Sequence, residues 1–341
     1  MNAILFVLPL FLAADPAPSR ITLTGPPRPL TDLAAELGRQ ANVRIDVDGT
    51  GKMAPISLKC DGIPFWEALE QLAMKSNQRL VVLPQGPRVT LGGGPYRAVP
   101  AQVRGPFRFN ARSVLGRVDL ESGQSTTEIH VDAVWEPTFK AYYAEVPAKS
   151  VTATDDRGNS LAVAEEGSGK MEVKDFGQEL TVRLTNIPRT SARIARLNGK
   201  LALVGTTEIL KFTFAPSSLD QKQEQSKVAA TLKKFKKAGR IWIAEVELQY
   251  PKGGPEFESF QSYLRDNQVW LERADKTKFT TTDFEIGAER QGKTTVSYRF
   301  LENEKDGFVI TEPKEWKLVL RTPGPIVEVT VDFELKDIRL P

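Results

Sequence analysis

Apolar residues recur at every second position in run after run beyond residue 107, and this alternation constrains the fold more than any other feature. The clearest runs are Ile129, Val131, Ala133 and Trp135, and Trp242, Ala244, Val246, Leu248 and Tyr250. Successive side chains of a strand point to opposite faces, so a period of two indicates strands with one buried face. Such runs, separated by turn residues, predict antiparallel sandwiches.

Three blocks of sequence recur in the same order, about 120 residues apart. Val134–Pro137 matches Leu248–Pro251, Val151–Leu161 matches Val269–Phe279, and Gly199–Phe214 matches Trp316–Phe333 with two inserted residues. Three matches in register favour a duplication over chance similarity. We therefore predict two related immunoglobulin-like β-sandwiches, at 107–216 and 222–341, joined by the polar segment 216–227, in a chain that is mainly β and multidomain.

Residues 1–17, MNAILFVLPLFLAADPA, contain an apolar run of about a dozen residues followed by small residues. This is the length of a secretory signal, and it is shorter than the ~20 residues that cross a bilayer. No Lys or Arg precedes the run, unlike most export signals, so another role or an upstream start is the alternative. No later segment predicts a membrane span. The expected location is the periplasm or the extracellular space.

In the segment 21–91 the spacing of apolar residues is different, because stretches with helical spacing alternate with stretches with strand spacing. A strand at Ile21–Thr24 precedes a helix with Leu30, Leu33, Ala34, Leu37 and Ala41 on one face and Thr31 as the expected N-cap. Strands at Val43–Val47 and Ile56–Cys60 lead to a second helix, which opens at Pro64 and carries Phe65, Trp66, Leu69, Leu72 and Ala73. A closing hairpin completes a small α+β module, and residues 92–106, rich in Gly and Pro, are the expected linker to the first sandwich.

The pattern PLTDLAAELGRQANVRIDVDGTGKMAPISLKCDGIPFWEALEQLAMKSNQRLVV in this segment resembles the secretin and TonB N-terminus short domain (STN) family. The resemblance lies in the order of the elements and in the helix core WEALEQLA, and it covers about a fifth of the chain. It implies protein contacts in the periplasm and carries no catalytic signature. The last sandwich resembles those of uncharacterised secreted proteins of planctomycete-type bacteria, which implies a compartment and a fold.

The inventory of reactive residues narrows the possible chemistry. The formal charge of +3 gives no argument for nucleic-acid binding. His130 and Cys60 are the single members of their types, so a zinc site is excluded by count, and a catalytic triad would have to use His130. His130 is expected on the exposed side of its strand, and Cys60 on the core side. The Gly-Ser-Gly-Lys sequence ending at Lys170 lacks the Ser or Thr that a phosphate loop needs next, because Met171 follows. We expect no cofactor, no metal and no enzymatic activity.

Three groups of residues are candidate binding features. Trp135, Phe139, Tyr142 and Tyr143 could form an aromatic platform for sugars or peptides, or pack in a core. Lys233, Lys234, Lys236, Lys237 and Arg240 could meet an anionic surface, or keep a hairpin edge soluble. Asp155–Asn159 could hold a cation or form a hairpin turn, and the turn is favoured.

These features favour an exported, non-enzymatic protein that acts through protein or cell-envelope contacts. The partner would be an envelope protein or a cell-wall component. The alternative is a cell-wall or polysaccharide-binding protein that uses the aromatic platform. A hydrolase with paired carboxylates is a third possibility that the many acidic residues permit. The oligomeric state is not predicted.

Overall fold

The structure, a computed structural model, describes residues 16–49, 53–82, 88–164, 169–173, 175–251, 264, 266–287, 293–303, 305 and 307–341. It is mainly β with several sheets, which confirms the predicted fold class; the immunoglobulin-like detail stays a prediction. The chain forms two compact units. The first contains residues 1–139, 143–203 and 328–341, and the second contains residues 140–142 and 204–327. Within the described ranges, neither helix is long and apolar enough to span a membrane.

The N-terminal module of the first unit has the predicted order of elements. These are β1 (Arg20–Leu23), α1 (Leu30–Ala41), β2 (Arg44–Val47), β3 (Cys60–Pro64), α2 (Phe65–Ser76), β4 (Leu80–Val82) and β5 (Arg88–Leu91). The strand expected at Ile56–Cys60 is wrong in its bounds, because β3 begins only at Cys60 and Ile56 forms an isolated bridge with Arg28. β1 pairs with β3, and β5 lies between β2 and β4. Pro29 and Pro64 hold the N-cap positions, so the expected cap at Thr31 is wrong. Both helices end at an asparagine in the left-handed conformation, Asn42 and Asn77, which tolerates it better than most residues do.

Buried contacts join this module to the following sheet. The Trp66 Nε1–H donates to the Pro106 carbonyl oxygen at 2.9 Å, and both groups are buried. The buried guanidinium of Arg108 lies 3.4 Å from Glu70 on α2, and the Tyr96 hydroxyl donates to the same carboxylate at 2.7 Å. Residues 101–104 of the predicted linker form a strand that pairs with the sheet. The module and the sheet therefore share one packed unit.

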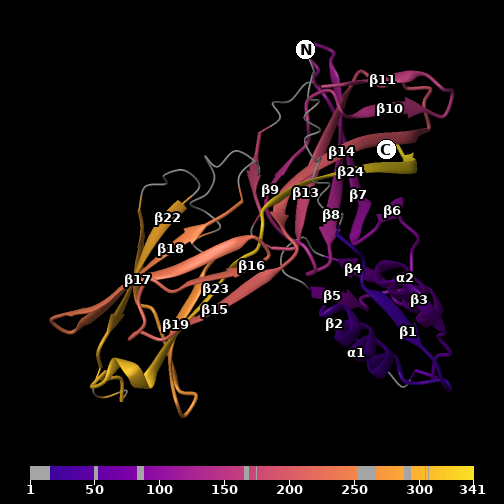
Figure 1. The fold of residues 1–341 in the computed structure, drawn as a ribbon. Helices are drawn as coiled ribbons and strands as arrows, with labels where there is room; N and C mark the ends of the chain where they lie inside the picture. The colour runs from indigo at the N-terminus through magenta and orange to yellow at the C-terminus, as the bar shows by residue number, and fades with distance from the viewer. Residues whose placement is uncertain are drawn as a thin grey trace, which may run out of the picture. The chain divides into compact units, whose positions relative to one another are not determined.

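The sheet that follows has ten strands. They are β6 (Ala101–Arg104), β7 (Phe107–Val118), β8 (Ser125–Trp135), β9 (Lys140–Glu145), β10 (Thr152–Asp155), β11 (Ser160–Val163), β12 (Met171–Glu172), β13 (Gly177–Thr185), β14 (Arg193–Thr206) and β24 (Val327–Arg339). The order is β12-β9-β14-β10-β11-β13-β8-β7-β6, with β24 beside β14 (Figure 1). In its core Phe109 stacks on Phe333 at 4.9 Å between ring centroids.

The second unit contains two further sheets. One consists of β15 (Ile209–Phe214), β19 (Gln268–Arg273), β20 (Lys278–Thr280) and β23 (Trp316–Pro323), and a 3-10 turn, η3 (Pro313–Glu315), precedes β23. The other consists of β16 (Lys222–Gln225), β17 (Val228–Ala238), β18 (Ile241–Gln249), β21 (Asp283–Ile286) and β22 (Lys293–Leu301). β16 falls within the predicted polar connector.

Each unit includes a strand from the other half of the chain. β15 lies in the sequence of the predicted first sandwich but pairs with β23 of the second unit. β24 lies in the predicted second sandwich but pairs with β14 of the first unit (Figure 1). The predicted boundaries at 216 and 222 therefore differ from the units of the structure. The physical reason is that both strands bury the same alternating pattern, so each can complete either sheet.

Candidate functional site

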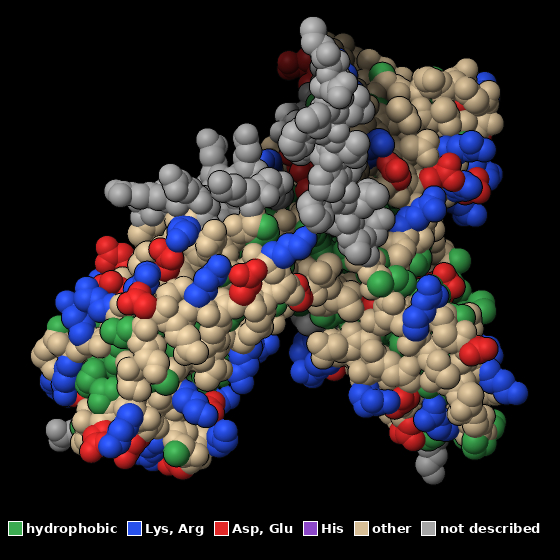
Figure 2. Space-filling model, in the orientation of Figure 1, with side chains coloured by type: hydrophobic (Ala, Val, Ile, Leu, Met, Phe, Trp, Pro, Cys, Tyr) green, Lys and Arg blue, Asp and Glu red, His purple; other side chains and the backbone are tan. Residues whose placement is uncertain are grey.

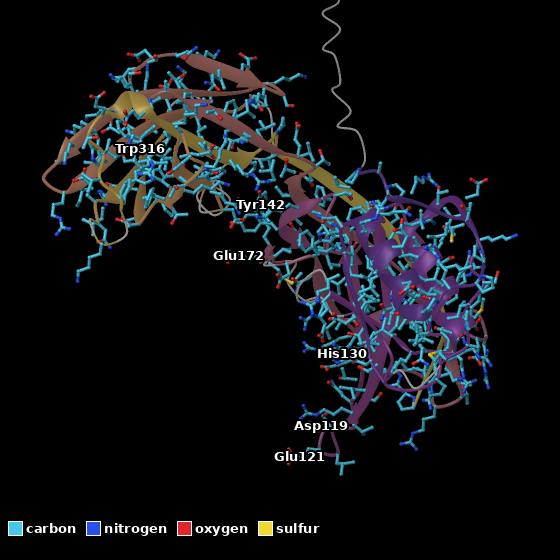
Figure 3. The ribbon with its side chains drawn as sticks, turned by 90° about the horizontal axis from the view of Figure 1, so that it is seen from below. Asp119, Glu121, His130, Tyr142, Glu172 and Trp316 are labelled. Carbon is cyan, nitrogen blue, oxygen red and sulfur yellow. The ribbon has the colours of Figure 1, made fainter. Side chains whose placement is uncertain are left out.

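A row of polar side chains follows the neighbouring strands β7, β8 and β13 of the first unit. On β8, Glu128, His130 and Asp132 alternate with buried apolar residues that face the core. His130 lies on the long β7–β8 hairpin, whose turn carries Asp119 and Glu121 (Figure 3). The alternation of the strand thus places three titratable side chains in a row on one face.

Strand β13 pairs with β8 and places one residue opposite each of Glu128, His130 and Asp132. The residues directly opposite are Glu179 for Asp132, Thr181 for His130 and Arg183 for Glu128. His130 Nδ1 lies 2.9 Å from Glu179 Oε1, and Arg183 Nε donates to Glu128 Oε1 at 2.7 Å. Arg112 of β7 lies 2.6 Å from the other oxygen of Glu179. The result is two adjacent groups of paired side chains across three strands, Arg112–Glu179–His130 and Arg183–Glu128.

The network fixes the ionisation of its carboxyl groups. Burial raises the pKa of Glu179, but hydrogen bonds from Arg112 and His130 outweigh it, and the net pKa is lowered. Asp132 is only 2% exposed, and burial raises its pKa although Arg112 lies 3.6 Å away. Hydrogen bonds therefore favour the charged form of Glu179, and burial favours the neutral form of Asp132.

His130 is half-buried and paired, so the expectation of a simply exposed strand residue is wrong. Its side chain is 18% exposed, and Nε2 lies 3.9 Å from Glu128, beyond hydrogen-bond distance. Ser113 lies opposite His130 on β7, but within the described part of the chain it makes no hydrogen bond to the ring. A nucleophile and its base normally lie 2.6–3.2 Å apart. Among the described residues, no three His, Cys, Asp or Glu side chains are placed so that they could hold one metal ion together.

A groove of about 980 Å³ borders this network beside β13. Its lining includes the five consecutive residues Glu179–Arg183, the β10–β11 hairpin, exposed Lys170 and the ring of Phe333. Consecutive strand residues point to opposite faces, so a lining made of all five runs along the edge of the strand. Leu180 and Val182 are buried and give the groove an apolar wall. The first unit thus offers an apolar groove with a polar rim, the usual composition of a binding site.

The predicted aromatic platform is wrong, because three of its four members are buried. Trp135, Phe139 and Tyr142 are at most 4% exposed, and Tyr143 is partly buried. Phe107 packs between Trp135 and Phe139, with ring centroids 6.3 Å and 6.0 Å apart. Burial also raises the pKa of Tyr142 well above its usual range. Burial of these rings agrees with core packing, which was the alternative interpretation of the pattern.

The predicted basic surface is largely paired with acids. Lys233 contacts Asp220 at 2.7 Å, Lys234 contacts Glu245 at 2.9 Å and Lys237 contacts Glu302 at 2.7 Å. The Arg240 guanidinium donates to the backbone carbonyl of Glu302, and Lys236 is exposed on β17. On the face of the second unit drawn in Figure 2, basic and acidic side chains are interspersed. This mixture is typical of a solvated surface.

Two smaller predictions agree with the structure, and a third falls largely outside it. Asp155 accepts hydrogen bonds from Arg157 and Asn159 in the β10–β11 turn, which confirms the turn interpretation. Cys60 is 4% exposed, on the core side of the module, and burial raises its pKa. Most of the Gly-Ser-Gly-Lys sequence, like residues 1–15, lies outside the described residues.

The sequence reasoning did not find Arg112, Glu179 and Arg183 as partners of His130. The available signal was the alternation of polar residues on each strand, but alternation does not say which strands are neighbours. It also missed Glu136, which is fully buried beside the N-terminal segment. Searches of family models, curated proteins and solved structures found no match for this chain.

Proposed function

We propose that this chain is an exported, non-enzymatic protein that binds other proteins of the cell envelope through its first unit. The groove along β13 carries the proposal, since it combines an apolar wall with a polar rim. The adjacent charged network supports a binding role, because its carboxylates are already paired with Arg112 and Arg183. We also propose that residues 21–91 are an STN-like adaptor, as their order of elements suggests, and that residues 1–17 direct export.

Site-specific cross-linking in intact cells tests the binding role. A light-activated cross-linking amino acid at Thr152, an exposed residue of the groove lining, should form adducts with an envelope protein. The same amino acid at Glu121, exposed in the β7–β8 turn outside the groove lining, is the matched control. Adducts from Thr152 above the control support the proposal. Equal yields at both positions contradict it.

Fractionation tests the export. The mature protein should occur in the periplasm or the medium, with its N-terminus close to Asp15. A protein recovered from the cytoplasm with Met1 retained would contradict export without affecting the argument from the groove.

A further inference from the structure

We propose that the outer face of the sheet β15-β23-β19-β20 in the second unit binds an acidic polysaccharide, that is, a polymer whose sugar units carry carboxylates. The surface belongs to the second unit and the ligand is not a protein. The inference therefore goes beyond the proposed function and does not rest on it.

The alternation of the four strands defines this outer face. Inward positions are buried, as Phe212 and Leu320 show. The outward positions carry one acid, Glu272, and four exposed cations, Lys211, Lys278, Lys317 and Arg321. A face with this composition has a positive potential, although the formal charge of the whole chain is only +3.

The four cations are available to a ligand, whereas the one acid is not. Glu272 lies 3.4 Å from Lys276 of the adjoining turn and accepts a hydrogen bond from the Trp270 Nε1–H at 3.3 Å. Among the described residues, none of the four cations lies within ion-pair distance of a carboxylate. Three lysines of β17, in contrast, already contact carboxylates. An anionic ligand would supply the partners that the four cations lack.

The register of the strands places these cations in two pairs at opposite ends of the face. Lys211 lies opposite Arg321 on β23. Glu272 of β19 has Lys317 opposite it on one side and Lys278 on the other. Arg321 and Lys317 are four residues apart on β23, so the two pairs are separated by about 13 Å along the strands. A polymer with negative charges at intervals fits this arrangement better than one compact anion does.

Neutral hydrogen-bonding groups lie between the two pairs. Thr213 and Thr280 are exposed in one row across the four strands, on either side of the half-buried Trp270. Gln268 lies beside Arg321, whose guanidinium donates to the amide oxygen at 3.2 Å. The hydroxyl and amide groups can pair with sugar hydroxyls, which stand between the carboxylates of such a polymer. This pattern of cation, neutral polar group and cation favours a polysaccharide.

Two other anionic partners fit this face less well. Single-stranded nucleic acid is bound by aromatic rings that are open to base stacking, but Lys278 Nζ lies over the Trp270 ring, 4.9 Å from its centroid. A membrane-binding face inserts several apolar side chains between the lipids. At the outward positions of these four described strands, Ile209, 42% exposed, is the one exposed large apolar side chain.

Polygalacturonate, a polymer of carboxylated sugars, is the probe. It is immobilised, and binding of the purified full chain is measured by biolayer interferometry. The double variant Lys211→Gln/Arg321→Gln removes one pair of cations from the face. Lys233→Gln/Lys236→Gln removes the same charge from exposed positions of β17 and is the matched control. Circular dichroism checks that both variants are folded.

A third variant separates recognition of sugar from general attraction of negative charge. Thr213→Val/Thr280→Val keeps every charge and removes both hydroxyls from the row between the cation pairs. Dextran, a neutral polysaccharide, is the control polymer. A single-stranded oligonucleotide and vesicles of anionic phospholipid are compared with polygalacturonate at equal concentrations of negative charge.

We expect the native chain and the β17 control to bind polygalacturonate within about twofold of each other, with binding that weakens as salt is added. Affinity should fall about tenfold for Lys211→Gln/Arg321→Gln and about threefold for Thr213→Val/Thr280→Val. The proposal is overturned if polygalacturonate does not bind at about 1 mM sugar units, if dextran binds equally well, or if the two charge variants lose affinity equally.

The assignment to a polysaccharide is overturned if the threonine variant binds like the native chain, or if the oligonucleotide or the vesicles bind more tightly than polygalacturonate. None of these outcomes bears on the proposed function, because the cross-links from Thr152 test that function in the first unit.

Discussion

Replacement of Glu136 with glutamine should stabilise the first unit at pH 8 and change its stability far less at pH 5. The Glu136 side chain is fully buried; one carboxylate oxygen accepts the Ser19 N–H at 2.7 Å, and the other has no hydrogen-bond partner among the described residues. Burial raises its pKa from 4.5 to about 7, although the bonds from Ser19 lower it. A buried carboxylate without full hydrogen bonding is costly, and glutamine removes the charge.

The direction of the pH dependence follows from the raised pKa. The folded chain binds the proton of Glu136 more tightly than the unfolded chain, so stability is fully present below pH 4.5 and is lost as the pH rises through about 7. One pKa unit corresponds to about 1.4 kcal/mol, so the loss is about 3 kcal/mol, of which about 2 to 3 kcal/mol falls between pH 5 and pH 8.

Urea unfolding of both proteins at the two pH values measures this loss. All other titrating groups are shared, so the difference in unfolding free energy between Glu136→Gln and the native chain isolates this carboxyl. The unfolding free energy of Glu136→Gln minus that of the native chain should increase by about 2 to 3 kcal/mol from pH 5 to pH 8. A difference that is the same at both pH values would refute the reasoning.

Three further substitutions test the packing of the first unit. Gly199→Ala should lower the unfolding free energy of the first unit by about 1–3 kcal/mol, because a Cβ there would lie 2.3 Å from the Phe333 ring. Adding Phe333→Leu to this variant should recover part of the lost stability. A loss that Phe333→Leu leaves unchanged would disprove the clash. Trp66→Phe should cost about 1–3 kcal/mol by leaving the buried Pro106 carbonyl without its donor, and an unchanged thermal midpoint would contradict this. The Cys60→Val variant should fold normally. In the native chain, the Cys60 thiol should react with a disulfide reagent only after unfolding, because it is buried. Rapid labelling of the folded native chain would contradict this.

The periodicity of apolar residues was sufficient to predict most helices and strands. It was insufficient to predict which strands pair with one another. In the N-terminal module, the spacing of Leu33, Leu37 and Leu69 alone indicates which helix faces are buried, whereas it does not indicate that β2 pairs with β5. His130 shows the limit. Its partner Glu179 lies 49 residues further along the chain, and the register that joins them depends on which strand follows β8 in the sheet. Nothing in the local pattern around either residue specifies that register.

The aromatic platform was mistaken for a related reason. Trp135 ends an alternating strand and was expected on the core side, but the residues after it lie in a turn and in β9, where the period of the previous strand no longer predicts burial. Phe139 is buried and packs against Phe107, and Tyr142 is buried as well. A cluster of aromatic residues in sequence is therefore poor evidence of an exposed surface unless the strand positions on both sides of the turn are known.

The exchange of β15 and β24 explains why the domain boundaries could not be predicted from the sequence repeat. Leu210, Phe212 and Phe214 of β15 and Val329, Val331 and Phe333 of β24 have the same alternation. Because β15 and β24 carry the same apolar pattern, the sequence cannot distinguish a strand that folds back on its own sheet from one that completes the other sheet. The repeat therefore specifies which strands exist and leaves their assignment open. It also follows that a cut between residues 216 and 222 would separate each sheet from one of its own strands, β24 from β14 and β15 from β23.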